Sequence, residues 1–209
     1  MKVAILGGTG SFGMALAARL VEAREDEIVI GSRDAARAEE AAAQLGGGTA
    51  GATNDVSVKG VDLAVLAVKA EGALDTARGV ASALGETPLL SVASALTFAK
   101  DGVRPDPDAR SLAERIQEVV KGPVVAGLHS IAAANLDAER PDEDAFICGD
   151  DPAAKALALE LAGRVVAGRA LDAGPLAGAR TLEGLTAVIV NLNRRYKART
   201  GMRVTGVGA

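Results

Sequence analysis

The amino-acid sequence predicts an α/β protein with a doubly wound parallel sheet, and three observations carry that prediction. Short apolar runs alternate with helical segments from residue 3 to residue 92. The run at residues 61–68 is apolar almost throughout, as expected of a strand that is buried on both faces of a parallel sheet. A glycine-rich turn follows the first apolar run and opens a helix, which is typical of the start of a strand–helix–strand unit. The rest of the chain predicts a small C-terminal α/β extension of this sheet.

The first part of the chain divides into strands and helices in regular alternation. We expect strands at residues 3–6, 27–30, 49–53, 61–68 and 88–92. We expect helices at residues 10–22, 34–45, 54–60 and 71–84, and the glycines at 46–48 end the second of them. Because strands joined through helices run parallel, these strands should share one sheet with helices on its two faces.

The alternation loosens after residue 92. Gly102, Pro105 and Pro107 predict a long loop at residues 93–108, and loops beyond the ends of parallel strands are where ligands bind. Further on, we expect helices at residues 109–120, 153–166 and 176–197, strands at residues 124–128, 145–148 and 169–171, and no regular structure at residues 201–209. The predicted division is a first domain at residues 1–120 and a smaller C-terminal part at residues 121–209.

The glycine-rich turn reads Gly8-x-Gly10-x-x-Gly13, between the first strand and the first helix. In that setting it is the fingerprint of a Rossmann-type dinucleotide-binding domain. Gly8 is expected to permit the tight turn, Gly10 to let backbone N–H groups approach a pyrophosphate, and Gly13 to let the helix pack closely on the strand. The positive end of the helix would then face the phosphates. An ordinary glycine-rich turn is the alternative, and the strand–turn–helix setting disfavours it.

The residues after the second strand indicate which dinucleotide binds. NAD sites usually place an acidic residue there for the ribose 2′-OH, whereas this chain has Ser32 and Arg33, with Arg37 one helical turn later. Guanidinium groups pair well with a 2′-phosphate, and the hydroxyls of Ser32 and Thr9 can also donate to it. Solvent-exposed arginines are the alternative, but arginine at the start of a helix opposes the helix dipole. NADP is therefore the predicted cofactor.

The composition excludes several classes of function. The net charge is −4 and only 2% of the residues are aromatic, so the basic face and stacking side chains that bind nucleic acid are missing. Cys148 and His129 are the single cysteine and histidine, which rules out an intramolecular disulfide and disfavours a metal site. Met1 and Lys2 lead straight into the first strand without a signal peptide, and no apolar run approaches the ~20 residues that span a bilayer. We therefore expect a cytoplasmic protein that acts on small molecules, with no membrane partner.

Two side chains are candidates for catalysis, although neither is singled out as certain. His129 lies at the carboxyl end of a predicted strand, where a site residue and a structural histidine are equally supported. Lys69 stands at the mouth of the 61–68 strand, either as a proton donor or contact for an acidic substrate, or as a solvated charge. The basic run at residues 194–197 is either a favourable helix end or an anchor for a polyanionic substrate.

Several phrases occur together and in a fixed order along the chain. They include Ile5-Leu-Gly-Gly-Thr-Gly10, Leu128-His-Ser-Ile131, Cys148-Gly-Asp-Asp151 and Leu171-Asp-Ala-Gly-Pro-Leu176, and the last two are much more specific than the glycine turn. Over nearly its whole length the chain resembles the F420H2:NADP oxidoreductase family. The resemblance implies a homodimeric oxidoreductase that moves a hydride between the nicotinamide C4 of NADP and C5 of the deazaflavin coenzyme F420.

The resemblance also implies where the ligands bind. The deazaflavin, as the second substrate, would lie near His129 and Ile131, with residues 121–209 completing its pocket and the dimer interface. The implied cofactor-binding residues are Gly8, Thr9, Gly10, Ser11, Phe12, Gly13, Ser32, Arg33, Arg37, Val68, Lys69, Ser91 and Ala93. Both ligands are preformed hydride carriers, so proximity and stacking do most of the work that acids and bases do elsewhere.

Two loops depart from the family pattern. Lys69 and Ala70 stand where the family tends to have a Pro-Trp-like pair, and residues 92–95 replace a proline-containing loop. Both loops border the expected second-substrate pocket, and their small side chains would make it roomier. Two alternatives therefore stay open: an NADP-dependent reductase of another carbonyl, imine or flavin-like acceptor, and a non-catalytic NADP-binding sensor.

Overall fold

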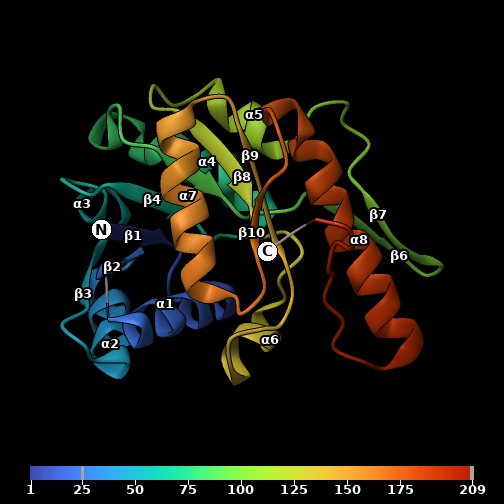
Figure 1. Ribbon diagram of the computed structural model, residues 1–209. Helices are drawn as coiled ribbons and strands as arrows, with labels where there is room; N and C mark the ends of the chain where they lie inside the picture. Colours follow the sequence, from blue (N-terminus) through green and yellow to red (C-terminus); the bar gives the residue numbers. More distant parts are fainter. Residues whose placement is uncertain (25, 208–209) are drawn as a thin grey trace.

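The computed structural model describes residues 1–24 and 26–207, and their helices lie on the two faces of one sheet (Figure 1). The strands are β1 (Lys2–Leu6), β2 (Glu27–Ser32), β3 (Ala50–Thr53), β4 (Leu63–Leu66), β5 (Leu89–Ser91), β6 (Leu96–Ala99), β7 (Gly102–Pro105), β8 (Val124–Gly127), β9 (Ala145–Gly149) and β10 (Ala170–Asp172). The helices are α1 (Ser11–Ala23), α2 (Ala35–Leu45), α3 (Asn54–Ser57), α4 (Ala70–Leu84), α5 (Leu112–Gln117), α6 (Ala133–Ala138), α7 (Pro152–Val165), the 3₁₀ helix η1 (Leu176–Gly178) and α8 (Ala179–Tyr196).

The central sheet has the strand order β10-β9-β8-β5-β4-β1-β2-β3. The strands β1 to β5 are parallel, as the sequence predicts, and β1 lies between β2 and β4. β8 joins the sheet parallel to β5. Alternate residues of a strand point to opposite faces, so Ile5 joins a core formed with α1, α2 and α7, whereas Leu6 joins one formed with α4, α5 and the start of α8. Burial on both faces explains why the central strands are continuously apolar.

One reversal of direction was not predicted. β9 runs antiparallel to β8, with Val125 opposite Gly149, and β10 is parallel to β9. The segment 128–144 therefore stays at the carboxyl edge of β8, because an antiparallel connection need not cross the sheet. The sheet also continues across residue 120, since β5 pairs with β8. Cys148 in β9 is fully buried, and burial raises the pKa of its thiol to about 11, as suits a structural cysteine.

The prediction of a long loop at residues 93–108 is wrong. That segment contains the antiparallel hairpin of β6 and β7, in which Phe98 lies opposite Val103. The side chain of Asn191 in α8 accepts from the Val103 N–H and donates to the Val103 carbonyl, both at 2.8 Å. The amide thus attaches the hairpin to α8 as a further strand would, and Figure 1 shows the two side by side.

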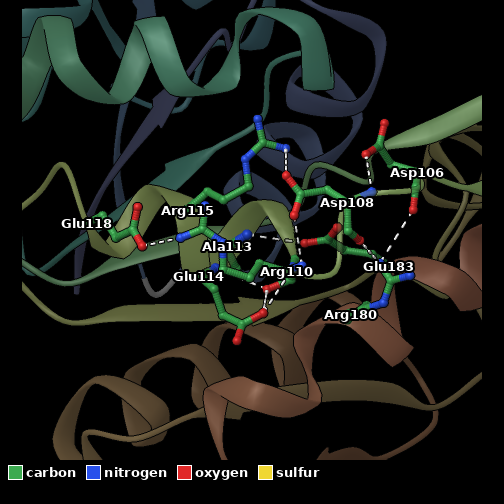
Figure 2. Close-up of polar contacts among 10 residues, drawn as sticks. Asp106, Asp108, Arg110, Ala113, Glu114, Arg115, Glu118, Arg180 and Glu183 are labelled. Carbon is green, nitrogen blue, oxygen red and sulfur yellow. Dashed lines mark hydrogen bonds and ion pairs between the residues drawn. The ribbon is translucent and has the colours of Figure 1, made fainter.

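The helix predicted at residues 109–120 is shorter than expected, and α6 was not predicted at all. Ser111 and Glu114 form a reciprocal capping box at the start of α5, so the helix cannot begin earlier. Two contacts then join the start of α8 to α5 and the loop before it (Figure 2). Arg180 donates to the carbonyls of Asp106 and Asp108 in that loop, and the Glu183 carboxylate accepts from the Ala113 N–H of α5 at 3.2 Å. Burial raises the pKa of Glu183. These contacts fix the start of α8 against the sheet.

Residues 201–207 have no regular secondary structure, as predicted, and residues 208–209 lie outside the described residues. The segment is nevertheless held in place. Asp144, whose side chain is fully buried, accepts from the Val204 N–H at 2.8 Å and pairs with Arg169 at 2.6 Å. Arg169 also donates to the carbonyls of Val204 and Val207. These hydrogen bonds with Arg169 keep the pKa of Asp144 well below its usual range.

Candidate active site

A cavity of about 1630 Å³ lies along the carboxyl edge of the parallel strands. Its walls come from the segments that follow β1, β2, β4, β5 and β8, together with α4, α8 and the hairpin strand β6. This edge is where doubly wound sheets bind ligands, because the loops there are free to vary while the strands hold them in place. The volume exceeds that of a usual single small-ligand pocket, which is about 300–1,000 Å³.

The glycine turn contributes to the cavity in a different way from the prediction. The residue with the left-handed conformation is Gly7, at φ 72°, so it is Gly7 rather than Gly8 that permits the tight turn. The Gly8 N–H donates to the carbonyls of Ile5 (3.1 Å) and Gly31 (3.0 Å) and faces the sheet. A Cβ on Gly13 would lie 2.7 Å from the Gly8 Cα, so Gly13 lets the helix pack closely on the glycine turn, whereas the sequence predicts close packing on the strand.

The start of α1 faces the cavity and has the features of an anion-binding helix start. Thr9, Gly10, Ser11 and Phe12 all line the wall. No side chain caps the helix at Gly10, and its first turn holds no acidic residue. The free N–H groups of that turn and the positive end of the helix dipole therefore face the cavity, as a pyrophosphate requires.

The predicted 2′-phosphate residues lie together at one end of the cavity. Ser32, Arg33 and Arg37 all line it, and both arginines are exposed. Within the described part of the chain, neither guanidinium has an ion-pair partner. Asp34, which was not predicted as a site residue, also lines the cavity. Its carboxylate caps α2 by accepting from the N–H groups of Ala36 (3.0 Å) and Arg37 (3.4 Å). Asp34 thereby orients the turn that carries both arginines.

His129 lines the cavity, and only 5% of its surface is exposed. Among the described residues, neither ring nitrogen makes a hydrogen bond of full geometry, and the backbone of Ala93 lies nearest to forming one. Burial lowers the pKa of His129 to about 4, so the ring is neutral at pH 7 and offers one donor and one acceptor.

The residue before His129, Leu128, has a left-handed backbone at φ 62°, a conformation that costs a branched residue roughly 1–3 kcal/mol. Such strain is typical of functional sites, and here it sets the direction of the histidine.

A hydrogen-bonded bridge that the sequence analysis missed supports this histidine. Thr186 of α8 donates its hydroxyl to the His129 carbonyl at 2.8 Å, and its oxygen lies 2.7 Å from the Ser94 hydroxyl. Because the Thr186 proton is already used, Ser94 is the donor of the second bond. Thr186 and Ser94 both line the cavity, so the bridge joins the loop after β5, the end of β8 and α8.

Most of the predicted site residues reach the cavity, and three do not. The predicted residues that line it are Thr9, Gly10, Ser11, Phe12, Ser32, Arg33, Arg37, Val68, Lys69, Ala93, His129 and Ile131. Gly8, Gly13 and Ser91 do not line the cavity, and Ser91 is fully buried in β5. The cavity-lining residues of α8 and the hairpin could not be predicted from the local sequence, because their position depends on which elements pack together.

None of the helices in the described ranges is long and apolar enough to cross a membrane. Residues 2–95 match the family described as NADP oxidoreductase coenzyme F420-dependent. The whole chain is similar to the F420-dependent NADP reductase of Methanocaldococcus jannaschii, at 34% identity over 99% of both chains. It is likewise similar to the F420-dependent NADP reductase of Methanothermobacter marburgensis, at 35% identity over 99% of both.

A solved structure from Arthrobacter sp. FB24 has the same fold along its full length. It superposes with a TM-score of 0.84 at 26% identity, over 98% of this chain and 99% of that one. The agreement thus includes the reversed strands and α8, beyond the dinucleotide-binding half. Taken with the whole-chain identity to the two reductases, it shows that this chain belongs to the coenzyme F420-dependent NADP oxidoreductase family.

Proposed function

We propose that this chain transfers a hydride between NADP(H) and the deazaflavin coenzyme F420. The observation that carries the proposal is whole-chain similarity to F420-dependent NADP reductases together with one cavity, lined both by the uncapped start of α1 and the exposed Arg33 and Arg37 and by buried side chains such as His129 and Ile131. When both are bound, NADPH supplies a hydride from its nicotinamide C4, and oxidised F420 takes it up at C5 together with one proton from solvent, leaving NADP⁺ and F420H2.

The residues present fit NADP. The uncapped start of α1 suits the pyrophosphate, and the unpaired guanidinium groups of Arg33 and Arg37 suit a 2′-phosphate. The hydroxyls of Thr9 and Ser32 lie on the same wall and add donors. We assign this binding to the predicted first domain, residues 1–120.

The second substrate would lie against residues from the predicted C-terminal part. Ile131 and Ile189 give this wall apolar surface, and His129 adds a polar but uncharged group. A neutral ring can hydrogen-bond the edge of a heterocycle without placing a charge beside the developing positive nicotinamide. The wall thus orients two flat ring systems and excludes water, which is what direct hydride transfer needs from a protein. Lys69 lines the cavity from the loop after β4 and stays a candidate contact.

Turnover is tested by mixing the protein with NADPH and oxidised F420 and following the loss of the deazaflavin's visible absorbance. We expect stoichiometric oxidation of NADPH and reduction of F420. Tight NADPH binding without any turnover would contradict the proposal and leave another acceptor or a sensor role.

The cofactor assignment is tested by Arg33→Asp. The loss of a charge-assisted contact of ~1.5–3 kcal/mol should reduce NADP affinity about 10- to 100-fold, with much less effect on NAD. Lys59→Asp is the matched charge reversal, since Lys59 is exposed and lies outside the cavity. Titration of each variant with NADP and with NAD measures the two affinities. An unchanged NADP affinity in Arg33→Asp would contradict the assignment.

We further propose that two copies of the chain associate through α8. Val188, Leu192 and Tyr196 follow one another at single-turn intervals and are 47%, 37% and 70% exposed. This stripe runs along α8 beside the residues of the helix that line the cavity. Light scattering should give a dimer mass for the wild type and a monomer mass for Leu192→Glu; a monomeric wild type at micromolar concentration would contradict the proposal.

A further inference from the structure

The cavity has a second positively charged end, formed by the last turn of α8. The residues of α8 that line the cavity include Thr186, Val190 and Asn193, which share one face of the helix. Arg194 follows Val190 by one turn, and Lys197 follows Asn193 by one turn at the end of the helix. The cavity-lining face of α8 therefore ends in two cationic residues, Arg194 and Lys197, which we call the rim of the cavity.

The hairpin holds one of these cations in position. The Arg194 guanidinium lies over the ring of Phe98, 5.6 Å from its centroid. Phe98 lines the cavity and is 63% exposed, so its ring is accessible to a ligand there. Its opposite residue in the hairpin is Val103, which Asn191 binds through both backbone groups. Phe98 is thus fixed beneath Arg194 by the same amide that attaches the hairpin to α8.

The rim cations carry charge that the described residues do not neutralise. Arg194 and Lys197 have no carboxylate within ion-pair distance in the described ranges. Other exposed arginines differ: Arg110 pairs with Glu118, and Arg203 pairs with Asp142. An arginine stacked on an aromatic ring presents its N–H groups outward in a plane, which suits a carboxylate or a phosphate.

The two cationic ends of the cavity lie on opposite sides of the molecule. Arg33 and Arg37 belong to the β2–α2 turn and α2, whereas Arg194 and Lys197 belong to α8; Figure 1 shows α2 and α8 on opposite sides of the sheet. His129 follows β8, which three strands separate from β2 in the sheet, and its carbonyl accepts a hydrogen bond from Thr186 of α8. Two anionic ligands can therefore enter from opposite ends and bring their uncharged rings together in the middle.

We propose that Phe98, Arg194 and Lys197 form a rim site for the acidic extension of the second substrate, outside the reacting ring. This inference rests on the proposed function, because F420 carries a phosphodiester and glutamate carboxylates on the side chain of its deazaflavin. The rim would hold that extension through charge-assisted contacts and leave the chemistry at the ring unaltered.

Steady-state kinetics with saturating NADPH test the rim site, with two acceptors compared. One is F420 with its acidic extension, and the other is the deazaflavin nucleoside core that lacks the phosphate and the glutamates. Arg194→Gln should raise the KM for F420 roughly three- to tenfold and leave kcat, the KM for NADPH and the KM for the core unchanged. Added salt should raise the wild-type KM for F420 and have a smaller effect on the variant, since exposed charges are screened.

Arg195→Gln is the matched control. Arg195 is the next residue on α8, has the same charge and is exposed, but it lies on the face opposite the cavity. It should leave both KM values unchanged, and the masses of both variants should equal that of the wild type. An equal rise for F420 and the core in Arg194→Gln, no rise in either, or an effect of Arg195→Gln as large as that of Arg194→Gln would each overturn the rim site.

Failure of the proposed function gives a different result. If the wild type turns over neither acceptor while it binds NADPH, the proposed function is wrong. The comparison is then made by equilibrium binding of the two deazaflavins, and the absence of any tail-dependent affinity would overturn the rim site as well.

Discussion

Protonation of His129 is coupled to folding, because the imidazole is buried and titrates far below its ordinary range. Its pKa falls from 6.5 to about 4 as a result of burial. Between these two values the unfolded chain binds a proton that the folded chain does not. The free energy of unfolding therefore decreases as the pH falls from 6.5 towards 4, and it is unaffected by this group above pH 7.

We expect His129→Gln to remove this part of the acid sensitivity. Between pH 7 and pH 4.5 the wild type should lose about 2 kcal/mol more stability than the variant, as a shift of this size implies. Urea unfolding at both pH values measures the difference. Burial raises the pKa of Glu143 and Glu183, but both remain in the variant, so the comparison isolates the histidine. Parallel losses in the two proteins would show that the imidazole is not buried as described.

At the level of single residues, the sequence was most informative where function lies next to a strand end. Arg33 follows a predicted strand by three residues and His129 follows one directly, and parallel topology brings such positions to one edge. Thr186 could not be found in this way. It reaches His129 across a separation of 57 residues, through the packing of α8 on the sheet. Asp34 could have been found, since an aspartate directly before an Ala-rich helix is a recognised capping signal.

Among the elements, α1 depends on the absence of a side chain at Gly13. In Gly13→Ala the new Cβ would lie 2.7 Å from the Gly8 Cα, and the helix would have to move away from the turn. We expect a loss of roughly 1–3 kcal/mol in stability and weaker NADP binding, because the helix start that faces the pyrophosphate moves with it.

Gly163→Ala provides the control. Gly163 lies within α7 with open space where a Cβ would be, so alanine should stabilise the protein by about 0.5–1 kcal/mol and leave NADP binding unchanged. Thermal unfolding and nucleotide titration of both variants provide the comparison. If the two substitutions behave alike, close packing at Gly13 is not what shapes the turn.

The elements of the parallel sheet could be predicted because burial on both faces produces continuous apolar runs. The hairpin of β6 and β7 could not, since its residues are mostly exposed and contain Gly102 and Pro105, which read as a loop. What stabilises it is the Asn191 amide, 88 residues away from Val103. The start of α5 was predictable in principle, because Ser111 and Glu114 have the spacing of a capping box.

For the molecule as a whole, the Asp144–Arg169 pair holds the C-terminal segment to the sheet. Arg169→Met would leave a fully buried carboxylate without its cation, which costs roughly 3–5 kcal/mol, and would free the carbonyls of Val204 and Val207. We expect a large drop in the urea midpoint and rapid proteolysis after residue 200.

Arg203→Met tests whether any arginine near this segment has the same effect. Arg203 pairs with Asp142, but the two side chains are 54% and 72% exposed, so removing the cation should cost less than about 1 kcal/mol. Equal destabilisation by the two substitutions would contradict the role given to burial of Asp144.

The overall topology could be predicted only as far as β8. Strands joined through helices imply parallel neighbours, whereas the direction of β9 depends on pairing between Val125 and Gly149, which leaves no mark in the local sequence. Apolar content alone cannot tell an antiparallel edge from a parallel one when both faces are covered.

The antiparallel direction of β9 also decides which end of α8 reaches the cavity. Because β9 and β10 run back towards the amino edge, α8 starts there, near Cys148, and reaches the cavity only with its later turns. Its terminal turn meets the hairpin, where Arg194 lies over Phe98 of β6. In a family with this arrangement, adding or removing turns at the carboxyl end of α8 would change the length of this wall of the cavity. The sheet and the glycine turn after β1 would stay as they are.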